Sequence, residues 1–79
     1  MQSQYLAMFD DHEQNWTWFK KNYQQLLKNY NREYVAIYQQ KVVDHDKDLS
    51  HLAKRVRTNY PLNRVLVEYV TSEKIVLVL

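Results

Sequence analysis

The chain has 79 residues, of which 25% are charged, and it carries a formal net charge of +2 and no cysteine. This length predicts one small domain over residues 1–79 with a marginal core, because a domain of this size buries only about 60–65% of its unfolded-chain surface. The lack of cysteine excludes disulfides and thiolate metal sites, and so small a net charge does not by itself indicate a nucleic-acid partner.

The absence of glycine is a second compositional signal, since about 7% of residues in an average protein are glycine. It excludes the P-loop, the dinucleotide fingerprint and the nucleophile elbow, which need a backbone without a Cβ at defined positions. Left-handed turn positions must then fall to Asn, Asp or Gln. The candidates are Asn29, Asn31, Gln39, Gln40, Asp46 and Asn63.

Residues 10–30 predict the first helix. Asp10 and Glu13 have the spacing of a capping box, and the apolar residues that follow recur at intervals of three and four, as one face of a helix requires. This stripe consists of Trp16, Phe19, Tyr23, Leu26, Leu27 and Tyr30. The conformation of residues 1–9 stays open between a longer helix and a segment folded over its start.

Residues 34–45 predict a β-hairpin around Gln39 and Gln40, because β-branched and aromatic residues dominate both flanking runs. A two-residue loop puts Ile37 opposite Val42, and Ala36 opposite Val43. One face then carries Tyr34, Ala36, Tyr38, Lys41, Val43 and His45, and the other Val35, Ile37, Val42 and Asp44. Two glutamines are unusual in a tight hairpin turn, so a four-residue loop is an equal alternative.

Residues 46–59 predict the second helix, with Asp46 or Asp48 as its N-cap and Pro61 as its stop. Its apolar stripe is Leu49, Leu52, Ala53, Val56 and Tyr60. Two further strands follow, over residues 64–70 and 75–79. The five consecutive aliphatic residues of the last run predict a strand buried on both faces.

These elements predict an α+β fold, a two-layer sandwich in the order α-β-β-α-β-β. Two helices would cover one face of a four-stranded mixed sheet, which is the simplest packing for this set.

Four segments carry a resemblance to a known family. They are W-x-W-F-K-K-N-Y at residues 16–23, E-Y-V-A-I at 33–37, K-V-V at 41–43 and K-D-L at 47–49. The chain resembles a family of small prokaryotic, largely archaeal, domains of unknown function over residues 15–70. Members typically have glycine where this chain has Arg32, Gln40 and Asp46, so the backbone at those turns is expected to differ. The resemblance implies no activity and no site.

Asp44, Asp46 and Asp48 form a D-x-D-x-D series, the pattern with which calcium-binding loops begin. Such a loop needs glycine at its sixth position and glutamate at its twelfth, where this chain has Leu49 and Arg55. Helix capping is therefore the preferred interpretation, and no metal or other cofactor is expected. His45 could join a weak metal site with these aspartates, but a solvent-facing histidine is preferred.

Asp48, Ser50 and His51 contain the residue types of a hydrolytic triad. Adjacent helical residues point about 100° apart, so Ser50 would not meet His51. No catalytic residues are assigned, and the chain is not expected to be an enzyme.

The densest basic cluster is the candidate surface for binding nucleic acid, because basic residues beside an aromatic ring can contact phosphates and bases. It consists of Lys54, Arg55, Arg57 and Arg64. Basic residues near a helix end also complement the helix dipole, which is the plainer explanation.

The tyrosine face of the hairpin is the candidate protein interface, because helices on one side of the sheet would leave its apolar side chains open. The last predicted strand is apolar on both faces, so it also needs a covering surface on the side that the helices leave open. The predicted interface residues are Tyr34, Tyr38, Val43, Ile75, Leu77 and Leu79. The alternative is that the tyrosine hydroxyls simply reach water.

The sequence thus predicts a small protein-interaction or structural module that self-associates as a homo-oligomer, a dimer in the first instance. An unidentified protein partner stays open, and the second hypothesis is a nucleic-acid-binding accessory protein. The N-terminus has no signal-peptide pattern and no apolar stretch is long enough to span a membrane, so a cytoplasmic location is expected.

Overall fold

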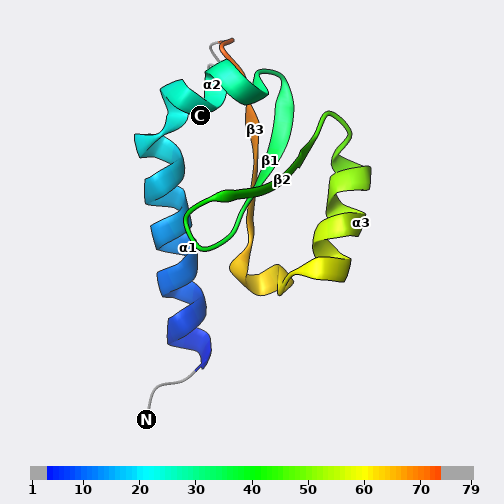
Figure 1. Cartoon of the computed structure of the whole chain (residues 1–79). Helices are drawn as coiled ribbons and strands as arrows, with labels where there is room; N and C mark the ends of the chain where they lie inside the picture. The colour runs from blue at the N-terminus through cyan, green and yellow to red at the C-terminus, as the bar shows by residue number, and fades with distance from the viewer. Residues whose placement is uncertain (1–3, 74–79) are drawn as a thin grey trace, which may run out of the picture.

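The computed structural model describes residues 4–73, with side chains from residue 11 onward. The elements within this range are α1 (Gln4–Lys21), α2 (Tyr23–Tyr30), β1 (Glu33–Ile37), β2 (Val42–Asp46), α3 (Leu49–Asn59), the short 3₁₀ helix η1 (Leu62–Arg64) and β3 (Leu66–Val70) (Figure 1).

The strands of the described range form one sheet in the order β2-β1-β3, with β1 in the middle. Both neighbours run antiparallel to β1, so β2 and β3 are parallel to each other and α3 connects them across β1. The predicted four-stranded mixed sheet is therefore wrong: the described sheet has three strands, all paired antiparallel, and the order is α-α-β-β-α-β. The predicted strand over residues 75–79 lies outside the described residues.

Helices cover both faces of this sheet, which also corrects the predicted two-layer packing (Figure 1). Val35 and Ile37 of β1 pack with Phe19 and Leu26 of α1 and α2. Ala36, on the opposite face of β1, packs with Leu52 and Val56 of α3. Because side chains alternate across a strand, a run of consecutive apolar residues in β1 buries side chains into both layers. The two apolar sides of the hairpin thus reflect two intrachain helix layers.

The predicted first helix is two helices. α1 already begins at Gln4, so Asp10 and Glu13 lie inside it and do not form a capping box at its start. The helical hydrogen bonds continue past Asn22, whose backbone N and side-chain Nδ2 both donate to the carbonyl of Trp18, at 3.0 and 2.9 Å. A side chain that competes for an i−4 carbonyl commonly bends a helix, and the helix is interrupted at this residue.

Residues 38–41 connect β1 to β2, and the bond from Tyr38 N to Lys41 O makes Gln39 and Gln40 the central residues of a tight turn, one of the two alternatives that the sequence left open. Gln39 and Gln40 take φ values of 52° and 60°, as a type I′ turn requires at both central residues. Ile37 pairs with Val42, as predicted, but Ala36 pairs with Asp44 because the register shifts between Ala36 and Ile37.

The extra residue in this β-bulge is Val43, and it reverses the side-chain alternation beyond it. The predicted faces are therefore wrong for the end of β2. Asp44 joins the face of Ala36, and His45 joins the face of Val35.

The second predicted helix is confirmed as α3, with Asp48 as its N-cap. Leu52 and Val56 from its predicted stripe are fully buried, whereas Leu49 is 45% exposed. β3 begins at Leu66 instead of Arg64 because η1 occupies the residues before it. None of the described helices has the combined length and apolarity needed to cross a membrane.

Candidate functional site

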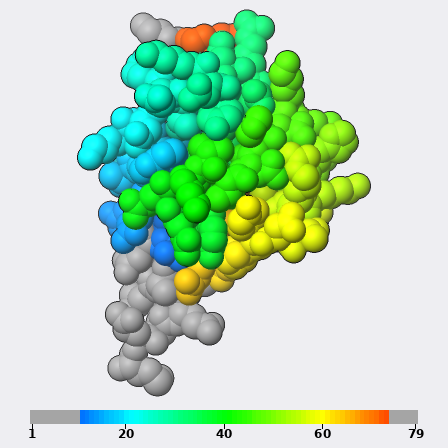
Figure 2. All heavy atoms as spheres, viewed as in Figure 1, coloured from blue at the N-terminus to red at the C-terminus, as the bar shows by residue number. Residues whose placement is uncertain are grey.

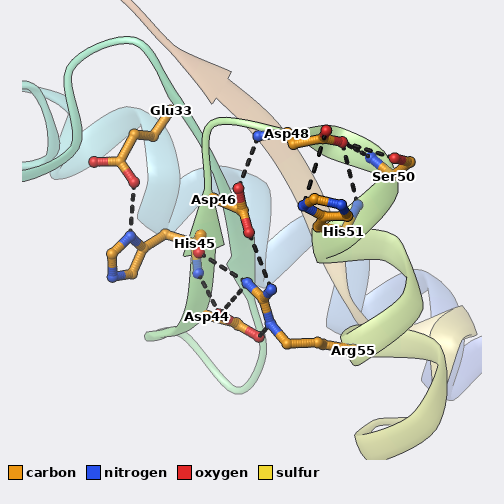
Figure 3. Close-up of polar contacts among 8 residues, drawn as sticks. All are labelled: Glu33, Asp44, His45, Asp46, Asp48, Ser50, His51 and Arg55. Carbon is orange, nitrogen blue, oxygen red and sulfur yellow. Dashed lines mark hydrogen bonds and ion pairs between the residues drawn. The ribbon is translucent and has the colours of Figure 1, made fainter.

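Arg55 of α3 holds the end of β2 through four hydrogen bonds (Figure 3). Its Nε and Nη2 donate to the two carboxylate oxygens of Asp44 at 2.9 and 3.0 Å. Its Nη1 donates to Asp46 at 3.0 Å, and Nη2 also donates to the backbone carbonyl of His45 at 3.1 Å. The planar guanidinium fits the Asp44 carboxylate in a fork that lysine could not reproduce.

The β-bulge at Val43 makes this arrangement possible. Without it, alternation would send Asp44 to the α1 and α2 face, and Arg55 could not reach it. The sequence suggested a D-x-D-x-D series, but the bulge gives its members separate roles. Asp44 and Asp46 hold Arg55, and Asp48 caps α3.

The N-cap of α3 uses the carboxylate of Asp48, which accepts hydrogen bonds from the backbone N of Ser50 at 2.9 Å and of His51 at 3.3 Å. Asp46 in turn accepts from the backbone N of Asp48 at 2.8 Å. The Ser50 hydroxyl donates to Asp48 at 2.7 Å. Its partner is thus the capping carboxylate and not an imidazole, which is the arrangement of a cap and not of a hydrolytic triad.

These contacts lower the pKa of each aspartate. The side-chain hydrogen bonds from Arg55 are the main cause for the lowered pKa of Asp44. For Asp46 the main cause is the backbone N–H of Asp48, followed by Arg55. The Ser50 hydroxyl and then the His51 N–H lower the pKa of Asp48. The two carboxylates raise the pKa of Arg55, so the whole cluster is ionised at neutral pH.

His45 points away from this cluster, onto the α1 and α2 face. Its Nδ1 lies 2.8 Å from Oε1 of Glu33, and its ring lies 4.8 Å from that of Tyr30. It therefore joins β2 to β1 and α2, and Figure 3 shows it turned away from the Asp44 side chain. Among the described residues no group of three or more histidine, aspartate or glutamate side chains is placed to hold a metal ion.

Two members of the basic cluster are neutralised by carboxylates. Arg55 is paired with Asp44 and Asp46 as above, and Nε of Arg64 lies 3.3 Å from Asp11. Lys54 and Arg57 are exposed on α3. Of the four predicted nucleic-acid contacts, two are therefore ion-paired within the chain and two are exposed on α3, so the four do not form one cluster of unpaired charges.

The tyrosine face of the hairpin is covered by α3. Tyr34, Tyr38 and Val43 are half-buried and pack against the cluster that contains Leu52 and Val56. The premise that this face stands open is wrong, because the second helix layer occupies it. Ile75, Leu77 and Leu79, also named as interface residues, lie outside the described residues.

The two edges of the sheet differ. The hydrogen bond from Tyr38 N to Lys41 O marks a bonded pair at the hairpin end. By antiparallel alternation, the backbone groups of Val42 and His45 then face outward on β2, and those of Val67 and Tyr69 face outward on β3. Side chains occupy both groups of His45, whose N donates to Asp44 at 2.8 Å and whose O accepts from Arg55.

The outward groups on β3 have no such cover within the part of the chain that the structure describes. Both ends of this open stretch are closed. Beyond it, the backbone N of Thr71 donates to the Tyr23 hydroxyl at 3.2 Å, and that hydroxyl donates to the Thr71 carbonyl at 2.8 Å. Before it, the N of Val65 donates to Leu62 O at 3.4 Å. Among the described residues, the uncovered part of this edge is therefore a short stretch at Val67 and Tyr69, which we call the free edge of β3.

Sequence reasoning missed the residue that ties the hairpin turn to the rest of the fold. Asn15 is 2% exposed; its Oδ1 accepts from the backbone N of Gln40 at 3.0 Å, and its Nδ2 donates to Arg64 O at 3.1 Å. Figure 2 shows the hairpin (green) lying against α1 (blue) on one side and against the yellow-green α3 on the other. The available signal was an asparagine four residues before the buried Phe19, on the same side of the helix.

Two surface hollows flank α1. The larger, of about 440 Å³, lies between α1 and the hairpin turn and is lined by Glu13, Gln14, Thr17, Trp18, Lys21 and Gln40. The smaller, of about 350 Å³, lies between α1 and the start of β3 and is lined by His12, Glu13, Trp16 and Leu66. Trp16 belongs to the predicted apolar stripe of the first helix but is 41% exposed.

Comparison with known proteins gave one family. The model of a family of unknown function (DUF5678) matches residues 25–73, which is more than half of the chain. The match includes the hairpin, α3 and β3, and leaves α1 with the W-x-W-F-K-K-N-Y segment outside. No curated protein and no solved structure matched the chain.

Proposed function

Because the chain belongs to this family of unknown function, we propose a role from its surface: it is a small protein-interaction module that self-associates through the free edge of β3. The observation that carries the proposal is the difference between the two sheet edges. Arg55 and Asp44 close β2 at His45, which leaves Val42 as a single outward residue beside the hairpin turn. Within residues 4–73, β3 presents the outward backbone groups of two successive outward residues, Val67 and Tyr69.

An unpaired strand edge is a template for another strand, and proteins commonly close the edges that they do not use. The side-chain cover of His45 on β2 and the two uncovered outward residues of β3 together support a pairing through β3. Two copies that join antiparallel through β3 form a closed, two-fold symmetric dimer with a continuous sheet, and no free β3 edge remains for a third copy.

The strand itself suits an interface. Leu66, Val67 and Glu68 are half-buried, and Tyr69 is 40% exposed. The Tyr69 ring packs against that of Tyr34 in a tilted arrangement, with ring centroids 4.8 Å apart and planes at 53°. An aromatic side chain that is already ordered loses little entropy on association. Self-association through this edge replaces the predicted use of the tyrosine face, which α3 covers.

The test is the mass of the protein in solution across concentration, by sedimentation equilibrium or light scattering. A concentration-dependent dimer is expected, and a strictly monomeric mass at high micromolar concentration would overturn the proposal.

A matched pair of variants then locates the interface at the edge. Tyr69→Ala and Tyr69→Pro both lose the ring, but only proline also loses the outward N–H. Since that N–H bonds to nothing within β1, both variants are expected to fold, as circular dichroism would verify. Tyr69→Pro should be monomeric at concentrations where Tyr69→Ala still dimerises. Equal dimerisation by both variants would show that the dimer does not form through the backbone of the β3 edge.

A further inference from the structure

The smaller hollow adjoins the free edge of β3. Leu66, the first residue of β3, forms part of its lining, and Trp16 of α1 forms another part. The indole of Trp16 is 41% exposed. An exposed tryptophan beside an open strand edge is typical of an interaction surface, because aromatic anchors at desolvated positions supply much of the binding energy.

The Trp16 side chain is held in place before any partner arrives. Its ring stacks on Phe19, with centroids 5.6 Å apart and planes 19° apart, and Nζ of Lys20 lies 5.6 Å from its centroid. Phe19 is buried, so its ring restrains the indole that stacks on it. A side chain ordered in this way adds contact area at a low entropic cost.

Resting on the self-association proposed above, we infer that the two copies pair their β3 strands around a two-fold axis at Val67, and that the hollows lined by Trp16 and Leu66 close against each other across this axis. Outward-facing residues pair with outward-facing residues, so three two-fold registers are available: centred on Val67, on Glu68 or on Tyr69.

Hydrogen bonds within one copy remove the register centred on Tyr69. It would pair Val67 with Thr71 of the second copy. The backbone N and O of Thr71 are already bonded to the hydroxyl of Tyr23. Breaking these part-buried bonds to make new ones brings no net gain.

Charge disfavours the register centred on Glu68. It would place the two Glu68 side chains directly opposite each other, and like charges at opposed positions destabilise a sheet. Burial already raises the pKa of Glu68, so a second carboxylate beside it would add to an existing cost. The register centred on Val67 puts Glu68 opposite Leu66 instead.

Strand pairing alone is too small to hold the dimer. The Val67 register pairs Val67 with Val67 and Tyr69 with Val65, and because the N–H of Val65 is already bonded to Leu62, it gives about four backbone hydrogen bonds. Specific interfaces bury about 1,200 Å² or more in total. Only this register brings Leu66 of both copies close to the axis, and with it both hollows. Contact between the two Trp16 side chains then supplies apolar area that the strands lack.

A cysteine scan reads the register directly, because the chain has no cysteine of its own. Val67→Cys, Glu68→Cys and Tyr69→Cys each place a thiol at the axis of one register. Disulfides need Cα atoms about 4.4–6.8 Å apart. Under mild oxidation, Val67→Cys is expected to form a covalent dimer rapidly and the other two slowly. Preferential cross-linking through position 68 or 69 would overturn the register.

The role of Trp16 is tested by dimer affinity. Trp16→Ala should raise the dissociation constant by about 30-fold, while Leu62→Ala, a change at an exposed apolar side chain of η1, should leave it within about twofold. In a Trp18→Phe background, the emission of Trp16 should move to shorter wavelength as the dimer forms.

The two proposals fail differently. A wild-type protein that stays monomeric removes the self-association and this inference together. If the wild-type protein dimerises but Trp16→Ala leaves its affinity unchanged and the Trp16 emission does not shift, the self-association stands. Only the claim that the hollow lies in the interface then fails.

Discussion

Arg55 and Asp44 form a two-point ion pair between α3 and β2, with Arg55 Nε 2.9 Å from Oδ2 and Nη2 3.0 Å from Oδ1 of Asp44. The same guanidinium covers the outward carbonyl of His45. Arg55 therefore both joins α3 to the sheet and covers the edge of β2 at His45. It is 43% exposed as a side chain, so its contribution to stability is reduced by solvent, and its role at the edge is the more specific one.

Replacing Arg55 is expected to open the second edge of the sheet. Arg55→Ala should form species larger than a dimer as concentration rises, because both β2 and β3 could then pair with other copies. Arg57→Ala, on the same helix and exposed, is the control and should keep the wild-type mass. Light scattering against concentration measures the difference. A wild-type mass distribution for Arg55→Ala would contradict the role of Arg55 at the edge.

Acid should destabilise the fold through the aspartate cluster. The pKa values of Asp44, Asp46 and Asp48 are all lowered from 3.8 in the folded state. The stability that they contribute is present above about pH 4 and is lost as pH falls through their lowered pKa values. The free energy of unfolding, measured with urea from pH 6 down to about 2, should therefore decrease, and Asp44→Asn should flatten this dependence.

Glu68 provides a control of opposite sign. Its pKa is raised by burial, so its charged form is disfavoured in the folded state and its protonation stabilises the fold as pH falls. Glu68→Gln should be more stable than wild type at pH 7, and this advantage should vanish below the ordinary glutamate pKa. An advantage that grew in acid would contradict the assignment.

Two leucines of α3, one turn apart, should respond differently to truncation. Leu52 is fully buried and Leu49 is 45% exposed. Leu52→Ala is expected to lower the free energy of unfolding by about 2–5 kcal/mol, whereas Leu49→Ala should change it by no more than about 0.5 kcal/mol. Equal losses in urea denaturation would show that α3 packs on the sheet by a different face.

Glycine substitutions test the turn positions. Gln40 has a φ of 60°, and a residue with a Cβ costs about 1 kcal/mol or more in that region. Gln40→Gly should therefore raise the free energy of unfolding by roughly 0.5–1 kcal/mol. Asp46→Gly is the counterpart. Asp46 lies in β2 and bonds to Arg55, so this change should destabilise the fold.

The resemblance implies glycine at three positions of this chain, and two of those positions have a left-handed backbone. Arg32 and Gln40 have positive φ, as does Gln39, and they are the non-glycine residues with this conformation in the described range. Composition had directed attention to Asn, Asp and Gln, so Gln39 and Gln40 were among the candidates and Arg32 was not. An arginine in a left-handed turn follows from the meeting of α2 and β1 and not from its own preference.

Local patterns determined much of this protein. The spacing of apolar residues predicted α3 and its buried Leu52 and Val56, the β-branched run predicted β1, and Asp48 was one of two predicted caps. These features depend on neighbours within a few residues, where propensity and periodicity act directly.

Only the tertiary structure decided which surfaces meet. One extra residue at Val43 reverses the side-chain alternation in β2, which sends Asp44 to Arg55 and His45 to Glu33. The pattern of β1 shows two apolar faces but not what covers them, because burial by a helix of the same chain and burial by a second copy require the same side chains. The structure assigns both faces to helices, and the edge of β3 is the surface that we propose for a second copy.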